Sequence, residues 1–207
     1  MPVTNIVPLT EWAIKSMVAG KHVLIEKPVS ANAEEARLVF ECAKKHNRIA
    51  MEAFHWQFHP ASHVVQALIS SGKYGKVLST YARMTTPTGS IPSSDIRWQF
   101  DLAGGSLMDM TYVVSATRYF LDAGASNEVT TAKARSMKKD KRVDESIEAT
   151  LNFTSRGESV TADIFTDMNL GNIMHVIPRL GDLPSIKIEL EKATIYYYKY
   201  VMVAFND

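Results

Sequence analysis

The segment at residues 20–28 constrains the fold of this chain more than any other. It reads Gly-Lys-His-Val-Leu-Ile-Glu-Lys-Pro, so a short apolar strand (residues 22–25) leads directly into a Glu-Lys-Pro tripeptide. Open α/β sheets bind their ligands at the carboxyl ends of their strands. Pro28 disfavours helical geometry for the residue before it and favours an extended one. The pattern therefore predicts that the Lys27 ammonium group points into a crevice at the end of a buried strand.

The neighbouring segments predict that this strand belongs to a βαβ unit. Residues 9–19 have helical apolar spacing, and Gly20 suits the end of that helix. Asn32 can cap a second helix, and residues 48–54 return as a strand. Short connections of this kind predict parallel strands with a right-handed crossover. Because only nineteen residues precede Gly20, we expect the earlier strands of a doubly wound sheet to be absent.

Beyond residue 76 the pattern changes to a series of strands with loops between them. One long helix, residues 106–121, interrupts this series, which predicts a mostly antiparallel sheet. The fold class is therefore α+β: a residual βαβ piece of a Rossmann sheet, followed by a mostly antiparallel sheet lobe with one long helix. The expected strands cover residues 78–85, 129–136, 146–154, 159–167, 185–190 and 193–200.

Composition excludes several classes of protein. The formal net charge is +1, which gives no electrostatic reason to expect nucleic acid or a membrane surface as a partner. Cys42 is the only cysteine, so a disulfide framework is excluded. No stretch is apolar enough for a membrane span and the first residues do not resemble a secretion signal. We expect a cytoplasmic protein.

Several motifs together resemble the Gfo/Idh/MocA oxidoreductases, in particular the dihydrodiol and xylose dehydrogenase branch. They are Glu-Lys-Pro at 26–28, Met-Glu-Ala-Phe-His-Trp-Gln-Phe-His-Pro at 51–60, Ser-Gly-Lys-Tyr-Gly-Lys-Val at 71–77 and the glycine-rich segment 95–109. The resemblance implies a residual Rossmann-like segment at residues 1–56 and the family's α+β substrate domain at residues 57–207. It also implies that Lys27 lies beside the nicotinamide and the substrate.

Three residues are the candidate catalytic groups: Lys27, Asp109 and Tyr112. A lysine beside a low-dielectric crevice can serve as acid, base or electrostatic clamp, although it could instead be paired with a carboxylate such as Glu26. Asp109 and Tyr112 are three residues apart and share a helix face, but a buried structural tyrosine is the alternative. The family pattern places its catalytic tyrosine or histidine at the position of Val113, so Tyr112 replaces it only if the helix start shifts.

Further residues are expected to contact a substrate on the basis of the resemblance. Gln57 stands where an arginine is common in this branch, which removes a permanent charge. His55, His59 and His63 are spaced like metal ligands, but Pro60 prevents one helical face from carrying them, so no metal is predicted. The predicted substrate-binding residues are Glu52, His55, Trp56, Arg97, Trp98 and Phe100.

The absence of a phosphate-binding turn governs the functional prediction. No Gly-x-Gly-x-x-Gly occurs in the 207 residues, and dinucleotide affinity in this fold depends on that turn. The sequence therefore predicts no cofactor and a cofactor-independent enzyme that isomerises, dehydrates or cyclises a small apolar substrate, for which a secondary metabolite is one candidate. The alternatives are an NAD(P)-dependent oxidoreductase of the family, or a fragment of one, and a non-catalytic dimeric binding protein.

The partners expected from the sequence are a small-molecule substrate and a second copy of the chain. Tyrosines alternate along the run Tyr196-Tyr-Tyr-Lys-Tyr200. Aromatic side chains on an open sheet face suit a subunit interface. We therefore expect a homodimer through the antiparallel sheet.

Overall fold

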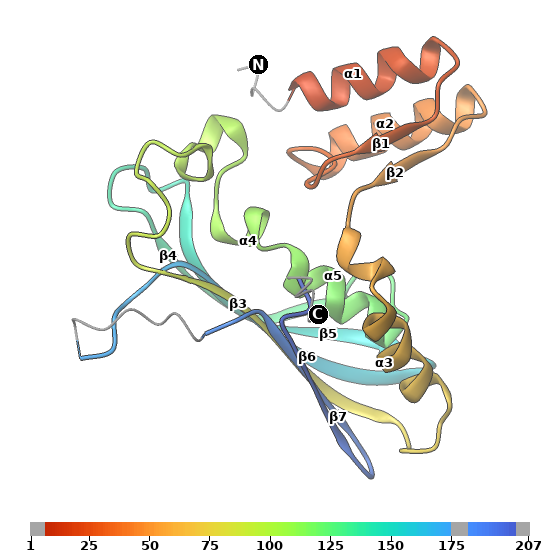
Figure 1. The fold of residues 1–207 in the computed structure, drawn as a ribbon, viewed down its shortest axis with the longest axis vertical. Coiled ribbons are helices and arrows are strands. Elements are labelled where there is room, and N and C mark those ends of the chain that lie inside the picture. Colours follow the sequence, from red (N-terminus) through yellow and green to blue (C-terminus); the bar gives the residue numbers. More distant parts are fainter. Residues whose placement is uncertain (1–6, 175–181, 202–207) are drawn as a thin grey trace, which may run out of the picture.

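A computed structural model describes residues 7–174 and 182–201 as two sheets of unequal size. The smaller sheet belongs to an N-terminal βαβ unit, and the larger one forms the rest of the molecule (Figure 1). The elements are α1 (Val7–Val18), β1 (Val23–Ile25), α2 (Ala33–Lys45), β2 (Ala50–Glu52), η1 (His55–Phe58), α3 (Pro60–Ser70), β3 (Val77–Pro87), η2 (Ile96–Trp98), η3 (Phe100–Leu102), α4 (Ser106–Asp109), α5 (Tyr112–Leu121), β4 (Glu128–Ser136), β5 (Asp144–Ser155), β6 (Glu158–Leu170), β7 (Ser185–Leu190) and β8 (Thr194–Tyr198).

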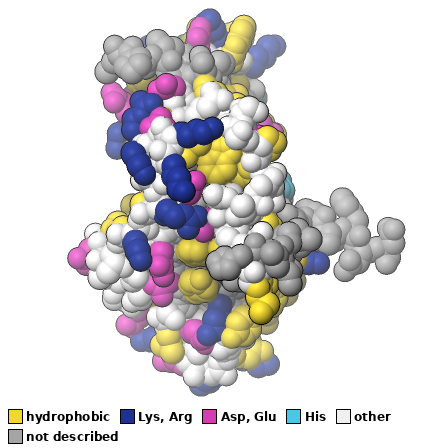
Figure 2. All heavy atoms as spheres, turned by 90° about the vertical axis from the view of Figure 1, so that its left-hand side faces the viewer, with side chains coloured by type: hydrophobic (Ala, Val, Ile, Leu, Met, Phe, Trp, Pro, Cys, Tyr) yellow, Lys and Arg dark blue, Asp and Glu magenta, His cyan; other side chains and the backbone are white. Residues whose placement is uncertain are grey.

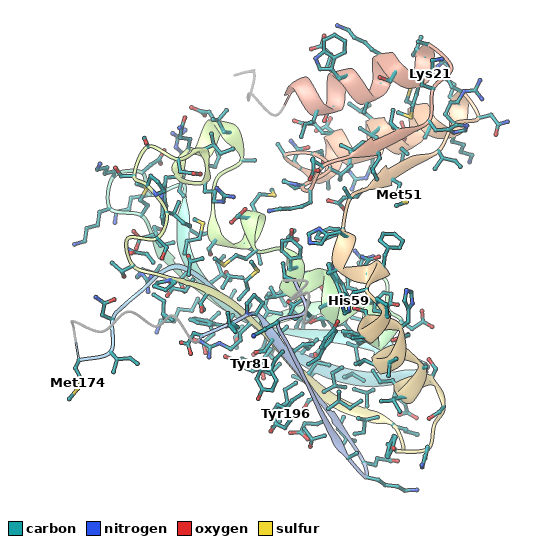
Figure 3. The ribbon with its side chains drawn as sticks, in the orientation of Figure 1. Lys21, Met51, His59, Tyr81, Met174 and Tyr196 are labelled. Atoms are coloured by element: carbon teal, nitrogen blue, oxygen red, sulfur yellow. The ribbon has the colours of Figure 1, made fainter. Side chains whose placement is uncertain are left out.

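The βαβ unit forms as its sequence predicts. Strands β1 and β2 pair in parallel, and the Asn32 side chain caps α2 by accepting from the Glu35 N–H group. Met17 of α1 and Val39 of α2 are fully buried in the small core that the two helices form with β1. Met51 of β2 is 41% exposed and lies on the side of the strands away from the helices (Figure 3).

The larger sheet has six strands in the order β4-β5-β6-β3-β7-β8. Neighbouring strands are antiparallel except β3 and β6, which are parallel. The predicted fold class is therefore confirmed: an α+β protein with a short parallel Rossmann-like piece and a mostly antiparallel second sheet. Helices α3 and α5 cover one face of this sheet (Figure 1), and the main core lies between them and the strands.

The prediction of one unbroken helix over residues 106–121 is wrong. Helix α4 ends at Asp109, and α5 begins at Tyr112. At the break the Val113 N–H group bonds to the Met110 carbonyl, a tighter i→i−3 bond. The β-branched residues Thr111, Val113 and Val114 follow one another closely here and weaken local helix propensity.

Membrane insertion finds no support among the described helices. None of them is both long and apolar enough to span a bilayer.

Candidate active site

An ion pair joins the end of β1 to the end of α4. The Lys27 ammonium donates to the carboxylate Oδ1 and to the backbone carbonyl of Asp109, both at 2.9 Å. Each of the two side chains is 19% exposed. Because 82 residues separate the partners in sequence, the contact fixes the Glu-Lys-Pro end of the βαβ unit against the substrate lobe.

Arg97 of η2 completes this network from the other side. Its Nε donates to Asp109 Oδ2 at 3.0 Å, and its Nη1 donates to Asp95 Oδ1 at 3.1 Å. The Asp109 carboxylate raises the pKa of the Arg97 guanidinium, while the backbone N–H group of Arg97 lowers the pKa of Asp95. One carboxylate therefore bridges two cations, an arrangement that holds both cations in place.

Tyr112 lies directly beneath Lys27. The Lys27 nitrogen is 5.2 Å from the centre of the tyrosine ring, and Phe54 packs edge-on against that ring with centroids 5.3 Å apart. Val113, at the position where the family usually has its catalytic residue, is fully buried. A new helix starts after the break between α4 and α5. This shifted start places Tyr112, rather than Val113, beside Lys27.

The electrostatic environment keeps Tyr112 protonated. Burial, followed by the charge of Asp109 and then of Glu26 and Glu52, raises the pKa of Tyr112 to about 12. Among the described residues the Tyr112 hydroxyl has no hydrogen-bond partner. Its oxygen is not fully buried. Tyr112 therefore carries its proton at neutral pH and is a weaker acid than an ordinary tyrosine.

We expect Tyr112 to titrate well above an ordinary tyrosine. A spectrophotometric titration of phenolate formation, taken as the difference between the wild type and Tyr112→Phe, should have a midpoint near 12. Because the native state holds this proton after the unfolded chain loses it, Tyr112 should also lower stability as pH rises from about 10 toward 12. A difference midpoint near the ordinary tyrosine value of about 10 would contradict this assignment.

The glycine-rich turn before α4 is explained by close packing. A Cβ atom on Gly104 would lie 2.6 Å from the Arg97 carbonyl oxygen, and one on Gly105 would lie 2.3 Å from Asp144 Oδ1. Asp144 of β5 accepts from the backbone N–H of Leu107 at 2.9 Å, which satisfies the start of α4. Sequence reasoning missed Asp144, because a helix cap supplied by a strand almost forty residues away leaves no local pattern.

Glu52 and His55 lie near the network but do not join it. The Glu52 carboxylate accepts from the Val29 N–H at 2.9 Å, and burial raises its pKa. The His55 Nε2 is 3.3 Å from the Val201 carbonyl oxygen, and its ring centroid is 6.3 Å from that of Tyr112. Glu52 therefore lies close enough for its charge to interact with both Lys27 and Tyr112, and His55 lies beside Tyr112.

The burial of Trp56 argues against its predicted role as a substrate contact. Its side chain is fully buried and packs against Tyr119, Phe120 and Tyr200 in the main core. A substrate-binding role requires access that this position lacks. The family motif at residues 51–60 predicted which segment contacts the substrate. It did not predict which side chains of that segment are buried, because burial alternates along η1.

Arg97, Trp98 and Phe100 line three different cavities, two of which adjoin one another. Arg97 lines a cavity of about 230 Å³ together with Lys27 and Asp109. Phe100 lines one of about 660 Å³, which shares Ala103, Gly104 and Met108 with the first, and Trp98 lines one of about 370 Å³. The residues predicted to line one substrate pocket are thus divided by the η2 and η3 turns.

A metal centre finds no support within residues 7–174 and 182–201. No group of three or more His, Cys, Asp and Glu side chains there could hold an ion. His59 instead caps α3, accepting from the Ala61 N–H at 3.2 Å.

The fold and the site define a two-part protein in which a Rossmann-type unit delivers a lysine to a helix-covered sheet. Two family models match the chain: "GFO/IDH/MocA C-terminal domain" over residues 63–195 and "Oxidoreductase family, NAD-binding Rossmann fold" over residues 10–54. The chain therefore belongs to the Gfo/Idh/MocA oxidoreductase family.

Individual relatives agree with this family. The D-xylose 1-dehydrogenase (NADP(+)) 2 of Haloferax volcanii is 36% identical over 152 residues, which are 72% of this chain and 46% of the relative. A dTDP-3,4-didehydro-2,6-dideoxy-alpha-D-glucose 3-reductase of Actinomadura kijaniata is 36% identical over 55% of this chain and 34% of its own. The chain thus spans between a third and a half of these relatives' lengths.

A solved structure extends the likeness to almost the whole chain. It is the crystal structure of a mutant 3-ketoreductase from Actinomadura kijaniata in complex with TDP-benzene and NADP. The two structures superpose with a TM-score of 0.68 at 26% identity, over 97% of this chain and 66% of the other.

These matches correct the functional prediction made from the sequence. The relatives are dehydrogenases and reductases, the matching Rossmann model is NAD-binding, and the solved relative holds NADP. The predictions of a cofactor-independent isomerase, dehydratase or cyclase and of no cofactor are therefore wrong, and the stated alternative of an NAD(P)-dependent oxidoreductase fits better. The error lay in predicting the reaction class from the phosphate-binding turn that these 207 residues lack.

Proposed function

We propose that this chain provides the substrate-binding and proton-transfer side of an NAD(P)-dependent oxidoreductase acting on a sugar-like substrate. The reaction interconverts a hydroxyl and a carbonyl group. The observation that carries the proposal is the Lys27–Asp109–Arg97 network with Tyr112 beneath it, at the carboxyl end of β1. Family membership and the relatives' sugar substrates support the choice of reaction and substrate class.

The residues at the end of β1 fit the nicotinamide end of the cofactor. The Lys27 ammonium has three N–H donors and uses two of them on Asp109, which leaves one for a ligand in the adjoining cavity. Pro28, Leu9 and Met108 supply apolar walls of that cavity. When bound there, NAD(P) supplies the hydride exchange. The 207 residues contain no Gly-x-Gly-x-x-Gly turn, so they account for the nicotinamide end only.

The chain's own residues orient the substrate and manage its proton. The free N–H of Lys27 can hold the reacting oxygen, and the ion pair with Asp109 fixes the direction of that donor. The Tyr112 hydroxyl, with its pKa raised to about 12, keeps its proton at neutral pH and donates it to the oxygen during carbonyl reduction. In the opposite direction the deprotonated Tyr112 oxygen takes this proton back from the substrate hydroxyl.

A substrate panel tests the proposed function. D-xylose, levoglucosan and a dTDP-linked keto sugar would be incubated with each nicotinamide cofactor, and nicotinamide absorbance would be followed. We expect cofactor-dependent turnover of at least one compound, because the polar groups needed for orientation and proton transfer are assembled. A protein that neither binds NAD(P)H nor turns over any member of the panel would contradict the proposal.

We further propose that the open face of the large sheet forms a homodimer interface. Tyr196 and Tyr198 are 56% and 63% exposed, and their rings stack with centroids 6.1 Å apart. Tyr81 is 41% exposed and lies with Tyr196 on the side of the sheet away from α3 and α5 (Figure 3). Such an aromatic face is normally covered by a partner.

Sedimentation velocity checks this interface. The wild type should sediment as a dimer at micromolar concentration, and the double variant Tyr196→Glu/Tyr198→Glu as a monomer, because buried carboxylates oppose association. Val64→Glu, at an exposed apolar position of α3, is the matched control and should remain dimeric. A monomeric wild type would refute the interface.

A further inference from the structure

A second cavity, of about 560 Å³, lies where the βαβ unit meets α3 and α5. Pro28 and Glu52 line it from the βαβ unit, Gln66 from α3, and Ser115 from α5. Its volume is within the range of about 300–1,000 Å³ that is usual for small-molecule sites. It shares only Pro28 with the Lys27 cavity, so it is a separate site.

The amide of Gln66 is left without a partner in the wall of this cavity. Its Oε1 is buried and accepts no hydrogen bond from the described residues, although buried polar groups normally have partners. Its Nε2 has no partner there either and is not fully buried. Because an amide both donates and accepts hydrogen bonds, Gln66 offers a ligand a polar group that the described protein does not use.

Other side chains of the wall have both donors and acceptors to spare among the described residues. Glu52 uses its Oε1 on a backbone N–H, which leaves Oε2 as an acceptor. Arg118 uses its Nε on the Gly124 carbonyl, which leaves its Nη groups as donors. The Ser115 hydroxyl accepts from Gln57 at 3.2 Å and can still donate its own proton. A ligand hydroxyl also donates and accepts, so several hydroxyls on one ligand match this wall.

The charges of the cavity argue against an anionic ligand. Glu52 and Asp122 lie in its wall, and Arg118 is the one basic residue of its described lining. Lys and Arg side chains gather instead on the left-hand side of the molecule in Figure 1, which Figure 2 turns toward the viewer, whereas α3 lies on the right. The cavity therefore suits a neutral ligand.

The cavity of about 660 Å³ beside Phe100 is a weaker candidate for a second site. Its amide and its charged side chains are already engaged, since Asn32 caps α2, Asp144 accepts from the start of α4, and Arg142 pairs with a carboxylate. Because it shares Gly104 and Met108 with the Lys27 cavity, it belongs to the reaction site.

We propose that the cavity between the βαβ unit, α3 and α5 is a second ligand site, which binds a neutral polyol of about the size of a monosaccharide. Gln66, Ser115 and Arg118 bind the hydroxyls of the polyol, and its C–H groups pack against Phe54 and Tyr119. A polyol bound there contacts the βαβ unit and the sheet lobe together. The site does not depend on the proposed oxidoreductase function.

Isothermal titration calorimetry with xylitol, D-xylonate and pentan-1-ol tests the class of ligand. The three compounds share a five-carbon chain and differ in hydroxyl groups and charge. We expect xylitol to bind at least about tenfold more tightly than the other two, because pentan-1-ol leaves the polar wall unpaired and xylonate meets two carboxylates. Saturating NADP+ should not displace xylitol, since only Pro28 is shared with the cavity proposed for the nicotinamide.

Gln66→Met tests the location of the site. Methionine keeps the length of the side chain and removes the amide, so xylitol should bind roughly tenfold more weakly. The fold should remain intact, because the lost Oε1 has no partner among the described residues. Gln99→Met is the matched control, since Gln99 is exposed and does not line the cavity; it should bind xylitol like the wild type. Xylitol should also raise the thermal unfolding midpoint of the wild type more than that of Gln66→Met.

Three results would overturn the proposal: equal binding of the three five-carbon compounds, unchanged xylitol binding in Gln66→Met, or displacement of xylitol by NADP+. Lys27→Met separates this site from the reaction site, because it should lower turnover and leave the Gln66-dependent binding of xylitol in place. Turnover that depends on Lys27 without any Gln66-dependent binding would leave the proposed function intact and remove the second site.

Discussion

Lys27→Met should lower the rate of cofactor-dependent turnover by about 10²–10³-fold, the usual cost of losing one hydrogen-bond donor to the reacting oxygen. The substitution keeps the length of the side chain but removes the ammonium group that contacts Asp109 and lies over the Tyr112 ring. Asp109 retains Arg97 as a partner, so the fold should survive. The measurement is the steady-state rate with the best substrate of the panel.

Lys21→Met provides the control for this experiment. Lys21 belongs to the same segment but lies at the far end of the βαβ unit from the ion pair (Figure 3). Its loss should leave the rate unchanged. If Lys27→Met turned over substrate within a few-fold of the wild type, the group that holds the reacting oxygen would have to lie elsewhere.

Trp56→Ala should destabilise the protein by about 3–5 kcal/mol, because removing a large buried aromatic side chain leaves a cavity. The side chain is fully buried among Tyr119, Phe120 and Tyr200. Trp56→Phe should cost less, because a phenyl ring leaves a smaller cavity than a methyl group does; both variants remove an indole N–H that has no partner among the described residues. Urea unfolding followed by circular dichroism gives both values.

The exposed Trp12 is the comparison for this pair of variants. Its side chain is 64% exposed, so Trp12→Ala should change the free energy of unfolding by no more than about 0.5 kcal/mol. A loss below about 1 kcal/mol for Trp56→Ala would mean that Trp56 is not a core residue, and its predicted role as a substrate contact would return.

Local patterns were sufficient for most of the fold. The apolar strand before Glu-Lys-Pro, the Asn32 cap and the alternation along Ser185–Leu190 each specify an element through neighbours in sequence. They also specify the parallel βαβ connection, because short crossovers allow only one geometry. The break between α4 and α5 was not predicted, since a few β-branched residues close together are only a weak signal against a helix.

The sequence by itself determined that Lys27 follows a strand, but it put Asp109 and Tyr112 on one helix where the structure has two. Only the tertiary structure decided that Lys27 meets Asp109 across 82 residues, that Arg97 holds the other carboxylate oxygen, and that Trp56 faces the core. The reason is physical: secondary structure follows the spacing of neighbouring residues, whereas an ion pair or a buried face depends on how separate elements pack.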